Sequence, residues 1–179
     1  MDEEVFARYF DPENIAYWLA FQLLTGNTDT QSRNVYLYSP QNSDCWYLLD
    51  WDNDGMLRRK EREIIQFSDS ESWERGVSNY WGNVLFRRCL QTESFRQLLD
   101  TAMDELYAYM KQDRIESMLA HYRSVTEEYV WRMPDRLYVP ITHEQYEEVL
   151  ESIWPEIDED YDYYWAVSYT HLRAHETPE

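Results

Sequence analysis

The sequence predicts an α+β fold that is mostly helical and contains one short β-hairpin. Residues 34–39 (NVYLYS) and 45–51 (CWYLLDW) are short aromatic and β-branched runs, and the residues between them have turn chemistry. From Trp81 onward, by contrast, apolar residues recur at helical spacing. At 179 residues, 44% of them hydrophobic, the chain is long enough for one domain with a sizeable core.

The first long helix is predicted over residues 12–25. Its apolar side chains are spread around the helix, which indicates that most of the helix is buried. Asp11 suits the N-cap and Pro12 the first helical position, and Gly26 is placed to end the helix.

The second half of the chain is predicted to be helical after a charged stretch. Residues 56–80 are charged and irregular, and we expect an exposed loop at SDSES. We expect the acidic residues 157–164 to form a solvated tail. Helices are predicted over residues 84–90, 94–110, 114–133 and 143–154. We assign four tryptophans to the core: Trp18, Trp46, Trp51 and Trp81.

The formal charge of −19 argues against a nucleic-acid polymer or an anionic membrane as partner. No apolar run is long enough to span a membrane, and no signal segment opens the sequence. Cys45 and Cys89 form no CxxC pair, so the sequence indicates neither a zinc site nor a disulfide framework. The cellular compartment stays open.

The last residues, VSYTHLRAHETPE, do not continue the pattern of the chain. They resemble a translated sequencing adapter, so we assign residues 1–166 to one domain and residues 167–179 to a non-native tail. His171 and His175 belong to this tail and are excluded as metal ligands.

The segment DWDNDG indicates a metal site, for which calcium and magnesium are the two candidates. Asp50, Asp52, Asp54, Gly55 and Glu61 match the calcium loop of an EF-hand. However, a strand-like run precedes Asp50 where an EF-hand needs a helix, and three basic residues fall inside the loop. The calcium loop at residues 50–61 is therefore the weaker alternative.

The magnesium alternative depends on the residues that precede the hairpin. Asp29 and Asn34 form a D-x-x-x-x-N pattern, and Asp52 follows the second strand. In protein kinases such an Asp orients the acceptor hydroxyl, the Asn holds a metal ion, and a second Asp holds the metals that bridge the nucleotide phosphates. A hairpin between them would fold Asp52 back beside Asp29 and Asn34.

Residues 14–55 resemble the core of the CotH kinases, an atypical protein-kinase-like family named after a spore-coat protein. The likeness extends over roughly residues 5–130, and its sharp motifs lie within residues 26–54. The residues that carry it are Trp18-Leu19, Gly26-Asn27-Thr28-Asp29, Asn34 with the following VYLY, and WYLL leading into Trp51-Asp52-Asn53-Asp54.

The resemblance implies ATP-dependent phosphorylation of Ser or Thr in a protein substrate, with Mg²⁺ or Mn²⁺, on the C-lobe of a kinase-like fold. Asp29 matches the catalytic aspartate. Asn34 and Asp52 match residues that bind the metal and the nucleotide, and Asp54 is a further metal ligand in support. By analogy with the family, a spore coat or cell surface is the expected location; the oligomeric state stays open.

The chain departs from the family at two places. Asp50 stands where relatives carry an apolar residue or proline, and the extra carboxylate should raise metal affinity or a pKa. The four glycines form no glycine-rich loop, and Lys60 and Lys111, the only lysines, follow the catalytic segment. We therefore expect the small N-lobe to be missing and this piece to be inactive alone. Two alternatives to a CotH-like kinase function are a non-catalytic coat or surface interaction module and a HipA-like kinase.

Overall fold

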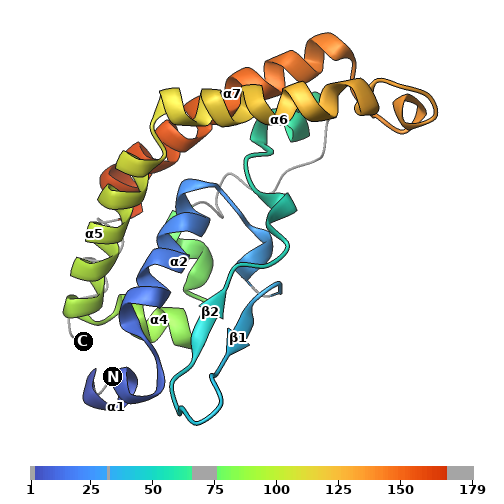
Figure 1. Ribbon diagram of the computed structural model, residues 1–179. Coiled ribbons are helices and arrows are strands. Elements are labelled where there is room, and N and C mark those ends of the chain that lie inside the picture. Colours follow the sequence, from blue (N-terminus) through green and yellow to red (C-terminus); the bar gives the residue numbers. More distant parts are fainter. Residues whose placement is uncertain (1–2, 32, 66–75, 169–179) are drawn as a thin grey trace.

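The computed structural model describes residues 3–31, 33–65 and 76–168 (Figure 1). The SDSES loop and residues 169–179 of the predicted tail lie outside these ranges. The helices are α1 (Glu3–Tyr9), α2 (Pro12–Leu24), α3 (Arg59–Ile64), α4 (Val84–Leu90), α5 (Glu93–Tyr109), α6 (Gln112–Val130) and α7 (His143–Tyr163). The strands are β1 (Tyr36–Tyr38) and β2 (Tyr47–Leu49), and short helical turns are η1 (Asp29–Gln31), η2 (Asn53–Gly55), η3 (Gly76–Tyr80), η4 (Asp135–Leu137) and η5 (Tyr164–Ser168).

Helix α2 lies at the centre of the fold and confirms the first predicted helix. The Asp11 side chain caps it by accepting a hydrogen bond from the Asn14 N–H at 3.0 Å, and Pro12 occupies the first turn. Helices α5 and α7 and strand β2 pack around it. Its buried residues are Ile15, Ala16, Trp18, Leu19, Ala20, Gln22, Leu23 and Leu24.

The predicted hairpin is present as the antiparallel pair β1–β2, which confirms the α+β class. Its register pairs Tyr36 with Leu49 and Tyr38 with Tyr47. The Asn14 carboxamide pins the hairpin to α2, because Asn14 Oδ1 accepts from the Leu48 N–H at 2.7 Å and its Nδ2 donates to the Leu48 carbonyl at 3.2 Å. This clamp fixes the strand that leads into the acidic loop.

The outer face of the hairpin is more exposed than the sequence predicted. Trp18 is buried and Trp81 packs against the core, but Trp46 and Trp51 are 42% and 56% exposed. Trp51 contacts the Tyr36 ring instead, with 5.2 Å between centroids. The core assignment of Trp46 and Trp51 was wrong. Trp51 has the parity of the outward-facing Leu49, and Trp46 lies before β2, in an isolated bridge to Phe10.

The acidic residues 157–164 do not form a solvated tail, contrary to the prediction. Helix α7 continues through them to Tyr163, and Ile157 and Tyr164 are buried in the core. Asp160 is buried as well, and its Oδ1 accepts a hydrogen bond from Arg59 Nη2 at 2.7 Å. The apolar residues recur at helical spacing, so burial on one face outweighs the acidic composition of the segment.

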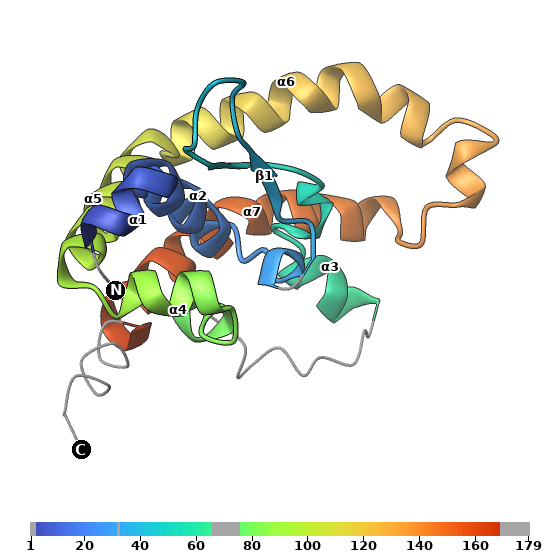
Figure 2. The ribbon, with the colours of Figure 1, turned by 90° about the horizontal axis from the view of Figure 1, so that it is seen from below.

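Helices α6 and α7 run side by side and extend away from the body of the molecule (Figures 1 and 2). Arg123 on α6 joins the pair by bonding both Glu127 on its own helix and Glu147 on α7. Within the described residues, no helix has the length and apolar content that a membrane crossing requires.

Candidate active site

The loop after α2 places Asp29 at the surface. Gly26 has a φ of 58°, a left-handed conformation that favours glycine and lets the chain turn away from the helix. The buried Asn27 then accepts a hydrogen bond from the Asp29 N–H at its Oδ1, at 3.2 Å. Asp29 opens η1 with its side chain 30% exposed. The predicted catalytic carboxylate is therefore accessible and has a fixed backbone.

The acidic loop, residues 50–55, packs directly against the loop that carries Asp29. The Leu57 N–H donates to the Thr25 carbonyl at 2.9 Å, which ties the end of the acidic loop to the end of α2. A β-carbon added at Gly55 would lie 3.1 Å from Asn27 Oδ1 and 3.2 Å from Asp29 Oδ2. The structure thus brings the two sequence motifs into contact at Gly55 and Asp29.

Asp52 and Asp54 point their carboxylates to the exposed side of the acidic loop. Asp52 has a left-handed backbone (φ 54°, ψ 51°), a conformation that Asp tolerates better than most residues. Within the described residues, its carboxylate has no hydrogen bond or ion pair. Asp54 interacts electrostatically with Arg58. Oxygen atoms are therefore available here for a ligand.

Asn34 lies at the same end of the hairpin as the acidic loop. Continuing the observed register of Tyr36 with Leu49 by two residues places Asn34 opposite Trp51, next to Asp52. Asn34 itself has a φ of 58°, so the chain turns there before it enters β1. The hairpin therefore brings Asn34 and Asp52 to the same end of its strand pair, whereas their meeting with Asp29 stays a prediction.

The donor chemistry of these residues fits a hard divalent cation, because carboxylate and carboxamide oxygens are its preferred ligands. The oxygens of Asp29, Asp52 and Asp54 do not, however, all lie within 4.8 Å of one another; in the described ranges only Glu127, His143 and Glu147 meet that criterion. Joint binding of one ion by Asp29, Asn34 and Asp52 stays a prediction.

A buried polar network, which the sequence analysis missed, joins the two loops beneath the surface. Gln22 of α2 is 1% exposed and accepts a hydrogen bond from Asn27 Nδ2 at 2.8 Å. Its own Nε2 donates to Asp50 Oδ1 at 3.0 Å and approaches Asn53 Oδ1 at 3.4 Å. The available signal was a glutamine within an otherwise apolar helix, a residue that is costly to bury without partners.

Tyr80 of η3 closes this network from the opposite side. Its hydroxyl lies 2.7 Å from Thr30 Oγ1 and donates to the Asn27 carbonyl at 3.2 Å. The ring packs against Trp18 and Phe86. Burial raises the pKa of Tyr80 well above its usual value, so the hydroxyl stays protonated and remains a donor.

The surroundings shift the pKa of two charged side chains: Asp50 in the acidic loop and Arg58 just after it. Desolvation raises the pKa of Asp50 above its usual range, and the hydrogen bond from Gln22 opposes part of that rise. The pKa of Arg58 is raised, chiefly by its hydrogen bond to Glu61. Desolvation opposes part of this rise, and the charges of Glu61, Asp54 and Asp29 add to it. The predicted extra carboxylate therefore has a perturbed pKa.

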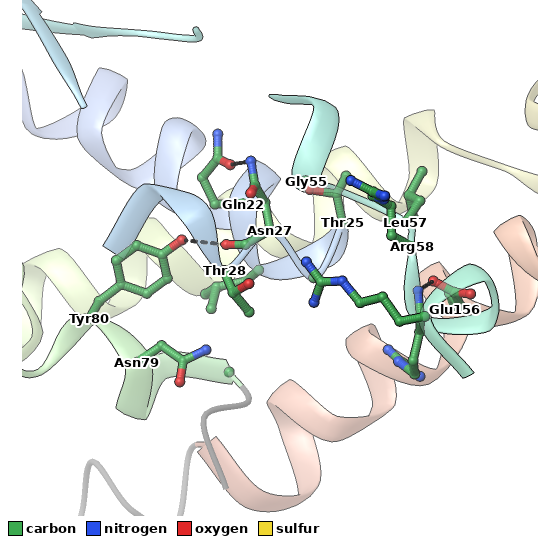
Figure 3. Close-up of a pocket in the computed structure, with 15 residues that line it drawn as sticks. Gln22, Thr25, Asn27, Thr28, Gly55, Leu57, Arg58, Asn79, Tyr80 and Glu156 are labelled. Atoms are coloured by element: carbon green, nitrogen blue, oxygen red, sulfur yellow. Dashed lines mark hydrogen bonds between the residues drawn. The ribbon is translucent and has the colours of Figure 1, made fainter. Parts of the chain in front are cut away.

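A small pocket opens beside this junction (Figure 3). Asn27, Thr28 and Gly55 line it together with Arg58 and with Glu156 of α7. Glu156 accepts hydrogen bonds from the first backbone N–H groups of α3, at 3.2 and 3.0 Å. The segment after the acidic loop is thus anchored to α7.

The comparisons with known proteins identify the family of the chain. The sequence model of the CotH kinase protein family matches residues 2–164. The chain belongs to the CotH kinase family. None of the curated proteins and none of the solved structures that were compared matches it.

The geometry does not support the alternative of an EF-hand in this CotH kinase family member. Strand β2, not a helix, leads into Asp50, and the short turn η2 occupies the middle of the segment. Glu61, which would close a calcium shell, is held by Arg58, with Nε to Oε2 at 2.6 Å. The expected entering helix and free glutamate are therefore both missing from this described segment.

A second group of metal-ligating types lies far from this site, on the α6–α7 pair. His143 Nε2 lies 2.9 Å from Glu127 Oε1. Arg123 bonds both Glu127 and Glu147, and together with His143 it lowers the pKa of Glu127 to about 2. Because the Arg123 guanidinium already bonds both carboxylates, we assign no metal to them.

Proposed function

We propose that this chain carries the catalytic base and the metal ligands of an ATP-dependent phosphotransferase on the C-lobe of a protein-kinase-like fold. The observation that supports the proposal best is the contact of Gly55 with Asp29, because it joins the D-x-x-x-x-N loop to the acidic loop. Membership of the CotH kinase family gives the reaction class. The proposed acceptor is a Ser or Thr hydroxyl of a protein substrate.

Asp29 would orient that hydroxyl and accept its proton. Its carboxylate is accessible, and Asn27 and η1 hold its backbone. Arg33 bonds Asp29 Oδ1 at 2.9 Å, but the Arg33 side chain is 72% exposed. Such exposed pairs contribute little stability, so a substrate can displace the arginine at small cost.

Mg²⁺ or Mn²⁺ would be held by Asp52 and Asn34, with Asp54 in support, and would neutralise charge on the transferred phosphate. Mg²⁺ keeps several of its waters and usually takes only one or two protein carboxylates beside the phosphates. In that mode of binding, Asp29, Asp52 and Asp54 need not all contact one ion.

Phosphate transfer also needs a phosphate-covering loop and a lysine, and neither is present before Asp29. We therefore expect this chain to bind the metal and to transfer no phosphate by itself. The transfer is tested in a protein that joins the chain to such a lobe, with labelled ATP, Mg²⁺ or Mn²⁺ and a Ser/Thr protein substrate.

Asp29→Ala and Asp52→Ala are each expected to lower the transfer rate on the order of 10²- to 10⁴-fold. Asp44→Ala, in the exposed turn of the hairpin, is the matched control and should retain the rate. Unchanged transfer in Asp29→Ala or Asp52→Ala would contradict the proposal. It would favour a non-catalytic interaction module on the same scaffold.

A further inference from the structure

The side chain of Gln22 in α2 reaches both loops of the proposed active site. Its Oε1 accepts from Asn27 Nδ2 at 2.8 Å and from Thr30 Oγ1 at 3.4 Å, both in the loop that carries Asp29. Its Nε2 donates to Asp50 and to Asn53 in the acidic loop. The two ends of one amide therefore serve different loops.

The hydrogen-bond types on the two sides cannot be exchanged. The Asp29 loop presents donors to Gln22, whereas Asp50 presents a carboxylate that only accepts. A glutamine satisfies both sides at once, and a glutamate or methionine at position 22 would not. Because the residue is 1% exposed, water cannot replace a lost partner freely.

Asn53 transmits this anchoring to the metal ligands. It lies between Asp52 and Asp54, and its Oδ1 is held from the inside by Asn27 Nδ2 at 3.2 Å as well as by Gln22. With Asn53 turned toward α2, the carboxylates on either side of it are exposed. The anchor also holds the loop in which Asp52 adopts its left-handed backbone.

We propose that Gln22 is a positioning residue for metal binding: its amide fixes the acidic loop with Asp52 against the loop with Asp29. The proposal rests on the proposed function, because it assigns Gln22 a role in that same site. Gln22 does not touch the metal or the substrate; it acts through Asn53 and Asp50. Losing such an outer partner typically costs about 10- to 100-fold in metal affinity.

The test is Mn²⁺ binding to the full chain, measured by electron paramagnetic resonance titration, in a charge-swap series. Gln22→Glu should weaken binding about 10-fold or more, although its added negative charge alone would tighten it. The double variant Gln22→Glu with Asp50→Asn restores a donor–acceptor pair with reversed direction and the original charge. It should recover affinity to within roughly threefold of the wild type, as a positioning role predicts.

Two further variants separate positioning from folding and from charge. Gln91→Glu adds the same charge at an exposed helix end and should leave Mn²⁺ affinity unchanged. Asn53→Ala removes a contact that the acidic loop makes with Gln22 and should weaken Mn²⁺ binding as much as Gln22→Glu does. The double variant Gln22→Glu with Asn53→Ala should bind no more weakly than either single variant. The Asn53→Ala variant, in a surface loop, keeps the test open if Gln22→Glu does not fold.

The outcomes distinguish this inference from the proposed function. Suppose that wild-type Mn²⁺ binding depends on Asp52. Unchanged or tighter binding by Gln22→Glu, or unchanged binding by Asn53→Ala, then overturns only the role of Gln22. A double variant Gln22→Glu with Asp50→Asn that binds no better than Gln22→Glu also overturns it. Absence of Mn²⁺ binding in the wild type, or binding that is independent of Asp52, overturns both proposals.

Discussion

Gly55 lies so close to Asp29 that a β-carbon on residue 55 would stand 3.2 Å from Asp29 Oδ2. The same atom would stand 3.1 Å from Asn27 Oδ1, so a methyl group meets polar atoms of the catalytic loop from two directions. The glycine of DWDNDG therefore permits a close approach between two loops. It is not needed there for a left-handed turn, since the positive φ values belong to other residues.

Gly55→Ala is predicted to push the acidic loop away from Asp29 by a few tenths of an ångström. We expect Mn²⁺ affinity to fall about 10-fold and the protein to lose about 1–3 kcal/mol of stability through overpacking. Isothermal titration and urea unfolding measure the two effects. Gly82→Ala is the matched control, because nothing lies within 4 Å of a β-carbon there; equal results for both variants would contradict the account.

Tyr80→Phe is predicted to destabilise the fold by about 1–2 kcal/mol, because the variant removes the hydroxyl that donates to the buried Asn27 carbonyl. The ring contacts with Trp18 and Phe86 are kept, so packing should not change. Chemical unfolding measures the loss. Tyr138→Phe, at an 80% exposed position, should show none, and a Tyr80→Phe protein as stable as the wild type would refute the buried network.

Asp50→Asn is predicted to flatten part of the pH dependence of stability. The raised pKa of Asp50 means that the folded state holds its proton more tightly than the unfolded state. Wild-type stability from this group therefore falls as the pH rises from the ordinary value of 3.8 through the raised value. The carboxamide oxygen introduced by Asp50→Asn can still accept from Gln22, and it carries no buried charge.

The pH prediction is checked by urea unfolding of both proteins, without metal, between pH 4 and pH 7. The difference in the free energy of unfolding, Asp50→Asn minus wild type, should increase with pH. A difference that stays constant, or that shrinks toward pH 7, would show that the Asp50 carboxylate is not desolvated in the folded protein.

Glu61→Gln is predicted to leave divalent-cation binding unchanged within about twofold, since the Glu61 carboxylate is already paired with Arg58 in a partly buried ion pair. The variant is titrated with Ca²⁺ and with Mn²⁺. Strong Ca²⁺ binding by the wild type that is lost in Glu61→Gln would restore the calcium loop as the explanation of residues 50–61.

Local patterns were sufficient for the hairpin, for α2 with its cap at Asp11, and for the family resemblance. These features depend on residues close together in sequence, whose periodicity and turn chemistry are directly visible. The role of Gln22 depends on partners in the acidic loop, 28 and 31 residues away along the chain. Composition misled at residues 157–164, where acidic side chains flank buried Ile157 and Tyr164.

The most direct test of the central claim is Mn²⁺ binding to the wild-type chain and to Asp29→Asn, Asp52→Asn and Asp44→Asn. All three changes remove one negative charge, but Asp52 is a proposed metal ligand and Asp29 lies beside the acidic loop, whereas Asp44 lies in the exposed turn of the hairpin. The account predicts that Asp52→Asn weakens binding at least about 10-fold, that Asp29→Asn weakens it measurably, and that Asp44→Asn matches the wild type. Equal affinity in all four proteins would contradict it.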